Sequence, residues 1–193
     1  MEATSMQQKS FLYPPGGIMI WILITLEIIT FGAAMIALGV SSRENPELFH
    51  ISRLKLNTLM GTVNTVFLLT SGYFMAVAVQ HVKQHMAPEA AKNILFALLG
   101  GLLFVVVKGF EYYAKIEHGY TIGYNTFFTF YWLLTLFHLI HVLVGMGILT
   151  GLYFSVRKGI TETRQENTET GAAFWHMCDL IWLFLFPVLY LIF

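Results

Sequence analysis

The C-terminal segment, residues 171–193, constrains the fold most strongly. It reads GAAFWHMCDLIWLFLFPVLYLIF, is almost entirely apolar, and is about long enough to cross a bilayer. It nevertheless carries His176 and Asp179. A carboxylic acid inside an apolar span costs about 2.5 to 3.5 kcal/mol on insertion scales, so it is usually paired or functional. Other helices must therefore supply partners for these polar groups.

The composition indicates a membrane protein. Of the 193 residues, 56% are hydrophobic and 11% are charged, whereas soluble globular proteins contain about 25% charged residues. The formal net charge is zero, so the sequence gives no sign of nucleic-acid binding. Cys178 is the single cysteine, which excludes an intrachain disulfide and a multi-cysteine zinc site.

Apolar runs separated by polar stretches predict an all-α fold, an integral membrane bundle of five transmembrane helices. We expect one domain over residues 1–193, with spans at about 18–40, 57–80, 89–116, 126–156 and 172–193. The stretches 41–56 and 157–170 are expected to be polar loops.

The basic residues near the span ends predict the orientation, because cytoplasmic loops are enriched in Lys and Arg. One side would carry Lys9, Lys83, Lys92, Arg157, Lys158 and Arg164. The other side would carry Arg43, Arg53, Lys55 and Lys115. This bias places the N-terminus in the cytoplasm and the C-terminus outside.

Glu27 lies near the middle of the first expected span, roughly 14 Å from its start at 1.5 Å per residue. No basic residue lies within a helical turn of it, so Glu27 must be protonated, pair with another helix or reach water. Two interpretations remain open. Glu27 is either a proton-handling or interaction site, or a neutral acid that joins two helices by hydrogen bonds.

Lys108 and Glu111 are three residues apart on the third expected span, so they share a face and can pair. They lie toward the outer end of the span, where a lysine can extend its charge to the membrane surface. We expect Lys108 to have a structural role at the lipid or interface surface. Trp175 and Trp182, which flank the polar face of the last span, are expected to contact lipid or an interface as well.

His138 and His141 are also three residues apart, at mid-membrane on the fourth span. Because histidine is a common metal ligand and haem axial ligand, they could form a haem or metal site that His176 completes. Alternatively, both are neutral and hydrogen-bond to Glu27, Asp179 or the backbone. On the last span, Asp179 would accept a hydrogen bond from His176 and fix its tautomer. A buried network of acids and histidines, taken by itself, indicates a subunit of a larger complex as readily as an enzyme.

Four stretches together resemble subunit III of the haem-copper oxidases. They are WILITLEIITFG at 21–32, KGFEY at 108–112, FHLIHVLVG at 137–145 and WHMCDLIWLFLF at 175–186. They occur in the order of that family and cover nearly the whole chain. The histidine stretch and the WHxxDxxW stretch carry most of the specificity.

The resemblance implies a non-catalytic accessory subunit of a cytochrome c oxidase-type terminal oxidase, in aerobic respiratory electron transport at a bacterial inner membrane. It would hold no cofactor itself and would pack on subunit I, which holds the haem and copper, and through it reach subunit II. Such subunits bind membrane phospholipid and support stability and proton uptake. Glu27 would match the family's buried carboxylate. The rest of the internal polar network would be Glu111, His138, His141, His176 and Asp179.

The sequence departs from the family's long form, which has seven spans and a lipid-holding cleft between the first two and the last five. Only the last five are recognised here, so another subunit would have to supply one wall of that cleft. The ending LFPVLY at 185–190 is closer to a short branch associated with nitric oxide reductases. An accessory subunit of a nitric oxide reductase is therefore an alternative. A di-histidine haem electron-transfer subunit and a proton-coupled transporter also stay open.

Overall fold

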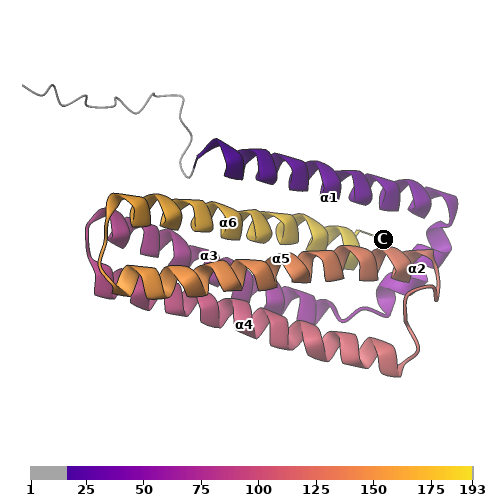
Figure 1. Ribbon diagram of the computed structural model, residues 1–193. Helices are drawn as coiled ribbons and strands as arrows, with labels where there is room; N and C mark the ends of the chain where they lie inside the picture. Colours follow the sequence, from indigo (N-terminus) through magenta and orange to yellow (C-terminus); the bar gives the residue numbers. More distant parts are fainter. Residues whose placement is uncertain (1–16, 193) are drawn as a thin grey trace, which may run out of the picture.

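The computed structural model describes residues 17–192 and contains six helices and no strand in that range (Figure 1). They are α1 (Ile18–Glu44), α2 (Pro46–Leu54), α3 (Thr58–Lys83), α4 (Ala87–Glu117), α5 (Thr126–Arg157) and α6 (Glu162–Tyr190). All except the short α2 are long and apolar enough to cross a membrane. The predicted all-α bundle of five transmembrane helices is confirmed.

Helices α3 to α6 form the core, and α1 lies along one side of it (Figure 1). Contacts run in a ring from α3 to α4, α5 and α6, and α6 returns to α3. Helix α1 packs mainly on α6 and α5. Helix α6 is consequently the most enclosed span, with 61% of its apolar window buried against 11% for α1. The C-terminal segment thus lies at the centre of the protein.

Two stretches expected to be polar loops are largely helical. Helix α2 occupies much of 41–56, and α6 begins at Glu162 instead of near residue 172. Thr161 caps α6, because its side chain accepts a hydrogen bond from the backbone N–H of Arg164 at 3.3 Å. The prediction assumed that each helix begins and ends where its apolar run begins and ends. A capped helix, however, continues through polar residues beyond the membrane.

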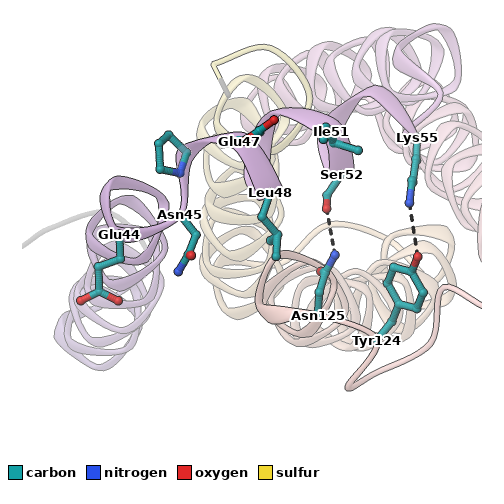
Figure 2. A pocket seen from close by; sticks show the side chains of 10 residues that line it. Glu44, Asn45, Glu47, Leu48, Ile51, Ser52, Lys55, Tyr124 and Asn125 are labelled. Carbon is teal, nitrogen blue, oxygen red and sulfur yellow. Dashed lines mark hydrogen bonds between the residues drawn. The ribbon is translucent and has the colours of Figure 1, made fainter.

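Helix α2 closes one end of the bundle. The Asn125 side chain caps α5 by accepting from the Phe128 amide at 2.8 Å, and it donates to Ser52 Oγ of α2 at 2.9 Å. Lys55 donates to Tyr124 Oη at 3.4 Å. Figure 2 shows these two contacts among the residues that line a pocket between the α1–α2 turn, α2 and the α4–α5 connection. The volume of this pocket is about 570 Å³. The α4–α5 connection is therefore tied to α2.

Candidate functional site

The most deeply buried ionised pair lies between α4, α5 and α6. Lys108 and Glu111 come from α4, Tyr131 from α5 and Tyr190 from the last turn of α6, and these four residues are called the Lys108 cluster below. The Lys108 Nζ and Glu111 Oε2 atoms are 3.0 Å apart, and each side chain is 1% exposed. The predicted pairing of Lys108 with Glu111 is present, but inside the bundle.

Hydrogen bonds close the Lys108 cluster. The Lys108 ammonium donates to Glu111 at 3.0 Å, to Tyr190 Oη at 2.8 Å and to Tyr131 Oη at 3.4 Å, which uses all three of its N–H groups. Both tyrosine hydroxyls donate to Glu111 Oε1, at 2.9 Å from Tyr131 and 2.6 Å from Tyr190. A buried ion pair is tolerated when such hydrogen bonds satisfy its remaining donors and acceptors. The Lys108 cluster meets this condition.

Three residues expected at the lipid or interface surface lie inside the bundle instead. Lys108, Trp175 and Trp182 are each at most 1% exposed. The indole N–H groups donate to α3, from Trp175 to Ser71 Oγ and from Trp182 to Thr65 Oγ1, each at 3.0 Å. The two tryptophans are enclosed because α1, α3 and α5 surround α6, and Lys108 is enclosed because its ammonium turns from α4 toward Tyr131 of α5 and Tyr190 of α6. Amphipathic side chains that suit a membrane surface suit an enclosed polar contact equally well.

Glu27 meets His141 across the α1–α5 contact. The Glu27 Oε1 and His141 Nε2 atoms are 3.3 Å apart, with the side chains 21% and 12% exposed. His141 Nδ1 lies 2.8 Å from the Phe137 carbonyl, which can only accept, so Nδ1 carries a proton. The two side chains are close enough to form an ion pair if His141 is protonated. The pairing of Glu27 with another helix agrees with both interpretations that the sequence left open.

His138 has quite different surroundings. It is fully buried, its ring stacks on Trp182 at a centroid distance of 5.4 Å, and the edge of Phe104 lies 5.7 Å away. Neither ring nitrogen has a hydrogen-bond partner among the described residues. Three residues along a helix turn a side chain by about 60°, which is enough to direct His138 toward α6 while His141 meets α1.

His176 and Asp179 lie on the α3 side of α6. His176 Nδ1 and Asp179 Oδ2 are 3.4 Å apart, as the sequence predicts for a pair. The Asp179 carboxylate packs where Gly72 of α3 has no side chain, and a Cβ at Gly72 would overlap it. Asp179 Oδ1 is buried without a partner among the described residues. A small residue on α3 thus makes room for the acid of α6.

The six residues expected to form one internal polar network therefore fall into separate groups. Glu111 belongs to the Lys108 cluster, Glu27 pairs with His141, His176 pairs with Asp179, and His138 lies among aromatic rings. The three histidines do not converge. Within residues 17–192, no group of three or more His, Cys, Asp or Glu side chains is placed to hold a metal ion.

Tyr131, Tyr190 and Gly72 are parts of these groups that the sequence analysis missed. Tyr131 lies seven residues before His138, two turns along the same face of α5, and this spacing could have indicated it. Tyr190, near the end of a span, has the pattern of an interfacial aromatic residue. Nothing in the sequence around Gly72 indicates that Asp179, more than a hundred residues later, lies against it.

Comparison with protein families decides the class of this protein. The family model for cytochrome c oxidase subunit III matches residues 49–192, from α2 to the end of α6. The chain belongs to the cytochrome c oxidase subunit III family. This is the family that the sequence motifs resemble. The residues that match the subunit III model include the Lys108 cluster and the His176–Asp179 pair, whereas α1 and Glu27 precede them.

Individual members of the subunit III family are moderately similar to this chain. Three proteins named cytochrome c oxidase subunit 3 are 32% identical over 133 residues in Rhizopus stolonifer, 30% over 132 in Artemia franciscana and 29% over 129 in Aedes aegypti. These alignments cover 66%, 68% and 66% of this chain, and 44%, 50% and 48% of the relatives. The chain spans about half the length of the curated relatives it matches.

Proposed function

We propose that this chain is a non-catalytic accessory subunit III of a haem-copper terminal oxidase of the cytochrome c oxidase type. The match to the subunit III family over residues 49–192 is the observation that carries the proposal. The relatives' name, cytochrome c oxidase subunit 3, supports a place in such a complex. In this proposal the haem and copper are held by subunit I, on which the chain packs, and subunit II is reached through subunit I.

The interior of the bundle supports a structural role in that complex. The charged and hydroxyl groups of the Lys108 cluster bond to one another, and they join α4, α5 and α6 at a single point. A satisfied buried network of this kind rigidifies the packing around it. The bundle can therefore present a fixed surface to subunit I, which is how an accessory subunit stabilises its partner.

The outward face of α1 supports packing on further protein or lipid. Only Ile20, Ile24, Phe31 and Leu38 of this helix are buried, and its remaining large side chains are mostly apolar and exposed. A membrane helix so little covered by its own chain meets acyl chains or another subunit. We propose that subunit I and phospholipid cover the apolar surface of the bundle.

The Glu27–His141 pair supports a contribution to proton uptake. It places a carboxyl group and an imidazole 3.3 Å apart near the middle of α1. An ionisable group at this depth is a functional candidate by default, because it is costly to keep there.

A cytoplasmic N-terminus in a bacterial inner membrane fits the basic residues. Lys83, Lys92, Arg157 and Lys158 are exposed at the end of the bundle where α1 begins. At the α2 end, Arg43 is exposed, and Arg53 and Lys115 donate to the backbone carbonyls of Tyr190 and Lys55. Basic residues are therefore more numerous at the end where α1 begins, and the enrichment of Lys and Arg in cytoplasmic loops favours a cytoplasmic N-terminus.

Cysteine labelling tests this orientation, because the single native cysteine, Cys178, is buried. In intact cells, a membrane-impermeant maleimide should label Thr121→Cys, in the α4–α5 connection, and should not label Gln84→Cys, in the α3–α4 connection. The opposite labelling pattern would reverse the proposed orientation.

Native co-purification in mild detergent tests the function. The proteins that accompany the chain are identified by mass spectrometry, and the visible spectrum of the preparation is recorded. We expect a large subunit with haem and copper that reduces oxygen. A partner that reduces nitric oxide would instead show the alternative accessory role. A chain that purifies alone and colourless, or alone with a haem spectrum, would overturn the proposal.

A further inference from the structure

A pocket lies along α6, between α1 and α3, in the half of the bundle where α1 begins. Helices α1 and α3 both pack on α6, and the space between them has a volume of about 590 Å³. Its lining combines small side chains, Ala76 of α3 with Ala172 and Ala173 of α6, and larger ones from α1, which include Trp21 and Ile28. A volume of this size is typical of sites for small molecules. This pocket is called the α6 groove below.

The α6 groove offers no unpaired charge to an ionic ligand. Among the described residues that line it, Lys83 and Glu169 are the only Lys, Arg, Asp or Glu, and their Nζ and Oε1 atoms are 3.2 Å apart. An ion bound beside this pair would lose its water without gaining a counter-charge, which is costly. The α6 groove therefore fits an uncharged molecule better than a phosphate ester or an amine.

Two side chains in the α6 groove can hydrogen-bond to a ligand. His176 Nδ1 lies 3.4 Å from Asp179 Oδ2, so a proton on Nδ1 points to the carboxylate and leaves Nε2 as an acceptor. Among the described side chains, neither Nε2 nor the Gln80 amide forms a hydrogen bond, and both residues are exposed. The amide of Gln80 can donate or accept.

These two groups lie at different depths in the α6 groove. Gln80 is four residues, or about 6 Å, from Ala76 along α3. Ala76 and His176 line a smaller neighbouring pocket together, so they lie at similar depths. A ligand that reaches both Gln80 and His176 therefore needs two polar groups at opposite ends of a short body.

The rest of the lining suits a flat ring with an apolar tail. The Trp21 indole offers an aromatic surface on which another ring can stack. One turn beyond His176, Leu180 lines the α6 groove and is 41% exposed, and Leu183 follows and is 40% exposed. These leucines lead toward the middle of the membrane, where an apolar tail would lie.

We propose that the α6 groove binds a lipophilic para-quinol. One hydroxyl donates to His176 Nε2, the other bonds to Gln80, and the tail follows Leu180. A para-quinol is uncharged and carries its two hydroxyls on opposite edges of one aromatic ring, so it matches the neutral lining and the separated polar groups. The proposal depends on the chain lying in a membrane and is independent of the proposed oxidase role.

The test is photolabelling of the full-length chain, with any partner that accompanies it, in phosphatidylcholine nanodiscs under argon. The probe is a short-chain ubiquinol with a diazirine at the end of its tail, and labelled peptides are identified by mass spectrometry. We expect labels on α6 or α3 near Leu183. Unlabelled decylubiquinol should compete with the probe, whereas decanol, which has the tail without the ring, should not.

Substitutions within the α6 groove should weaken labelling. Gln80→Leu and His176→Leu each remove one hydrogen bond and should raise the half-saturating probe concentration about fivefold. His176→Gln keeps an acceptor and should have a smaller effect than His176→Leu. Ala76→Phe fills the pocket, retains both polar groups and should raise the half-saturating concentration by about tenfold or more.

Two matched controls make the same changes on α3 outside the α6 groove. Gln84→Leu and Val66→Phe alter exposed residues that do not line it, and both should be labelled as the unaltered chain is. All variants are compared at equal helix content by circular dichroism.

Four results would overturn the proposal. The first is labelling confined to a partner or to helices other than α1, α3 and α6. The second is equal competition by decanol and decylubiquinol, which would show a merely apolar surface. The third is an equal effect of Gln80→Leu and Gln84→Leu. The fourth is labelling of Ala76→Phe at the same probe concentration as the unaltered chain.

Discussion

The Lys108 ammonium of α4 donates to the Tyr190 hydroxyl of α6 at 2.8 Å, across 82 residues of sequence. Tyr190 in turn donates to Glu111 at 2.6 Å, so the last turn of α6 is fixed to an ion pair within α4. The last turn of α6 is thereby held inside the bundle by charge-assisted hydrogen bonds, which are stronger than hydrogen bonds between neutral groups.

Replacing Lys108 alone should be severely destabilising. Lys108→Met leaves the Glu111 carboxylate buried without its counter-charge, and breaking a buried pair in this way typically costs about 3 to 5 kcal/mol. Lys108→Met/Glu111→Leu removes both charges and should recover much of that loss. The measurement is the unfolding midpoint of the purified chain in mixed micelles with increasing dodecyl sulfate. Lys158→Met, at an exposed position, is the control, and a Lys108→Met variant as stable as this control would contradict the prediction.

Two glycines of α5 should respond differently to an added methyl group. A Cβ at Gly145 would lie 2.7 Å from the Trp175 ring, whereas a Cβ at Gly147 meets nothing within 4 Å. Gly145→Ala must displace a fully buried indole, and overpacking of this kind costs roughly 1 to 3 kcal/mol. Gly147→Ala should leave the unfolding midpoint unchanged or raise it, because alanine favours a helix. Equal effects of the two substitutions would show that α5 and α6 are not in the close contact described.

Asp179 should tolerate an amide better than an apolar side chain. Asp179→Asn keeps a group that can hydrogen-bond to His176, whereas Asp179→Leu puts a larger apolar group against Gly72 and leaves the imidazole unpaired. We expect lower yield of folded chain for Asp179→Leu, measured by size-exclusion chromatography of detergent extracts. Equal yields for both variants would count against a structural hydrogen bond at this position.

Glu27→Ala should shorten the working life of the complex without removing its haem spectrum. The substitution leaves His141 without the carboxyl group that lies 3.3 Å from it, but it changes no residue of the proposed subunit I. Oxygen consumption is followed over many turnovers, with Glu117→Ala, at an exposed position, as the control. If the Glu27→Ala preparation also lost the haem spectrum of the partner, Glu27 would be needed for the haem site itself and the prediction would be refuted.

The local part of the candidate site was predictable, and the long-range part was not. The pairs Lys108–Glu111 and His176–Asp179 each lie three residues apart on one helix, so helix geometry alone brings them together. The contact between Glu27 and His141 could be proposed only as one of several options, because two apolar helices can pack in many rotations about their axes. The same uncertainty left Tyr131 and Tyr190 unrecognised as partners of Glu111.

The sequence by itself determined that this chain is a bundle of five membrane-spanning helices in the cytochrome c oxidase subunit III family. Apolar length sets the number of spans, and the short motifs carry the family resemblance. The tertiary structure decided which side chains are enclosed: it placed Lys108, Trp175 and Trp182 inside, and separated the histidines into different surroundings. Hydropathy measures how apolar a helix is, whereas enclosure depends on which neighbours its faces meet, and that is fixed only when all the helices pack together.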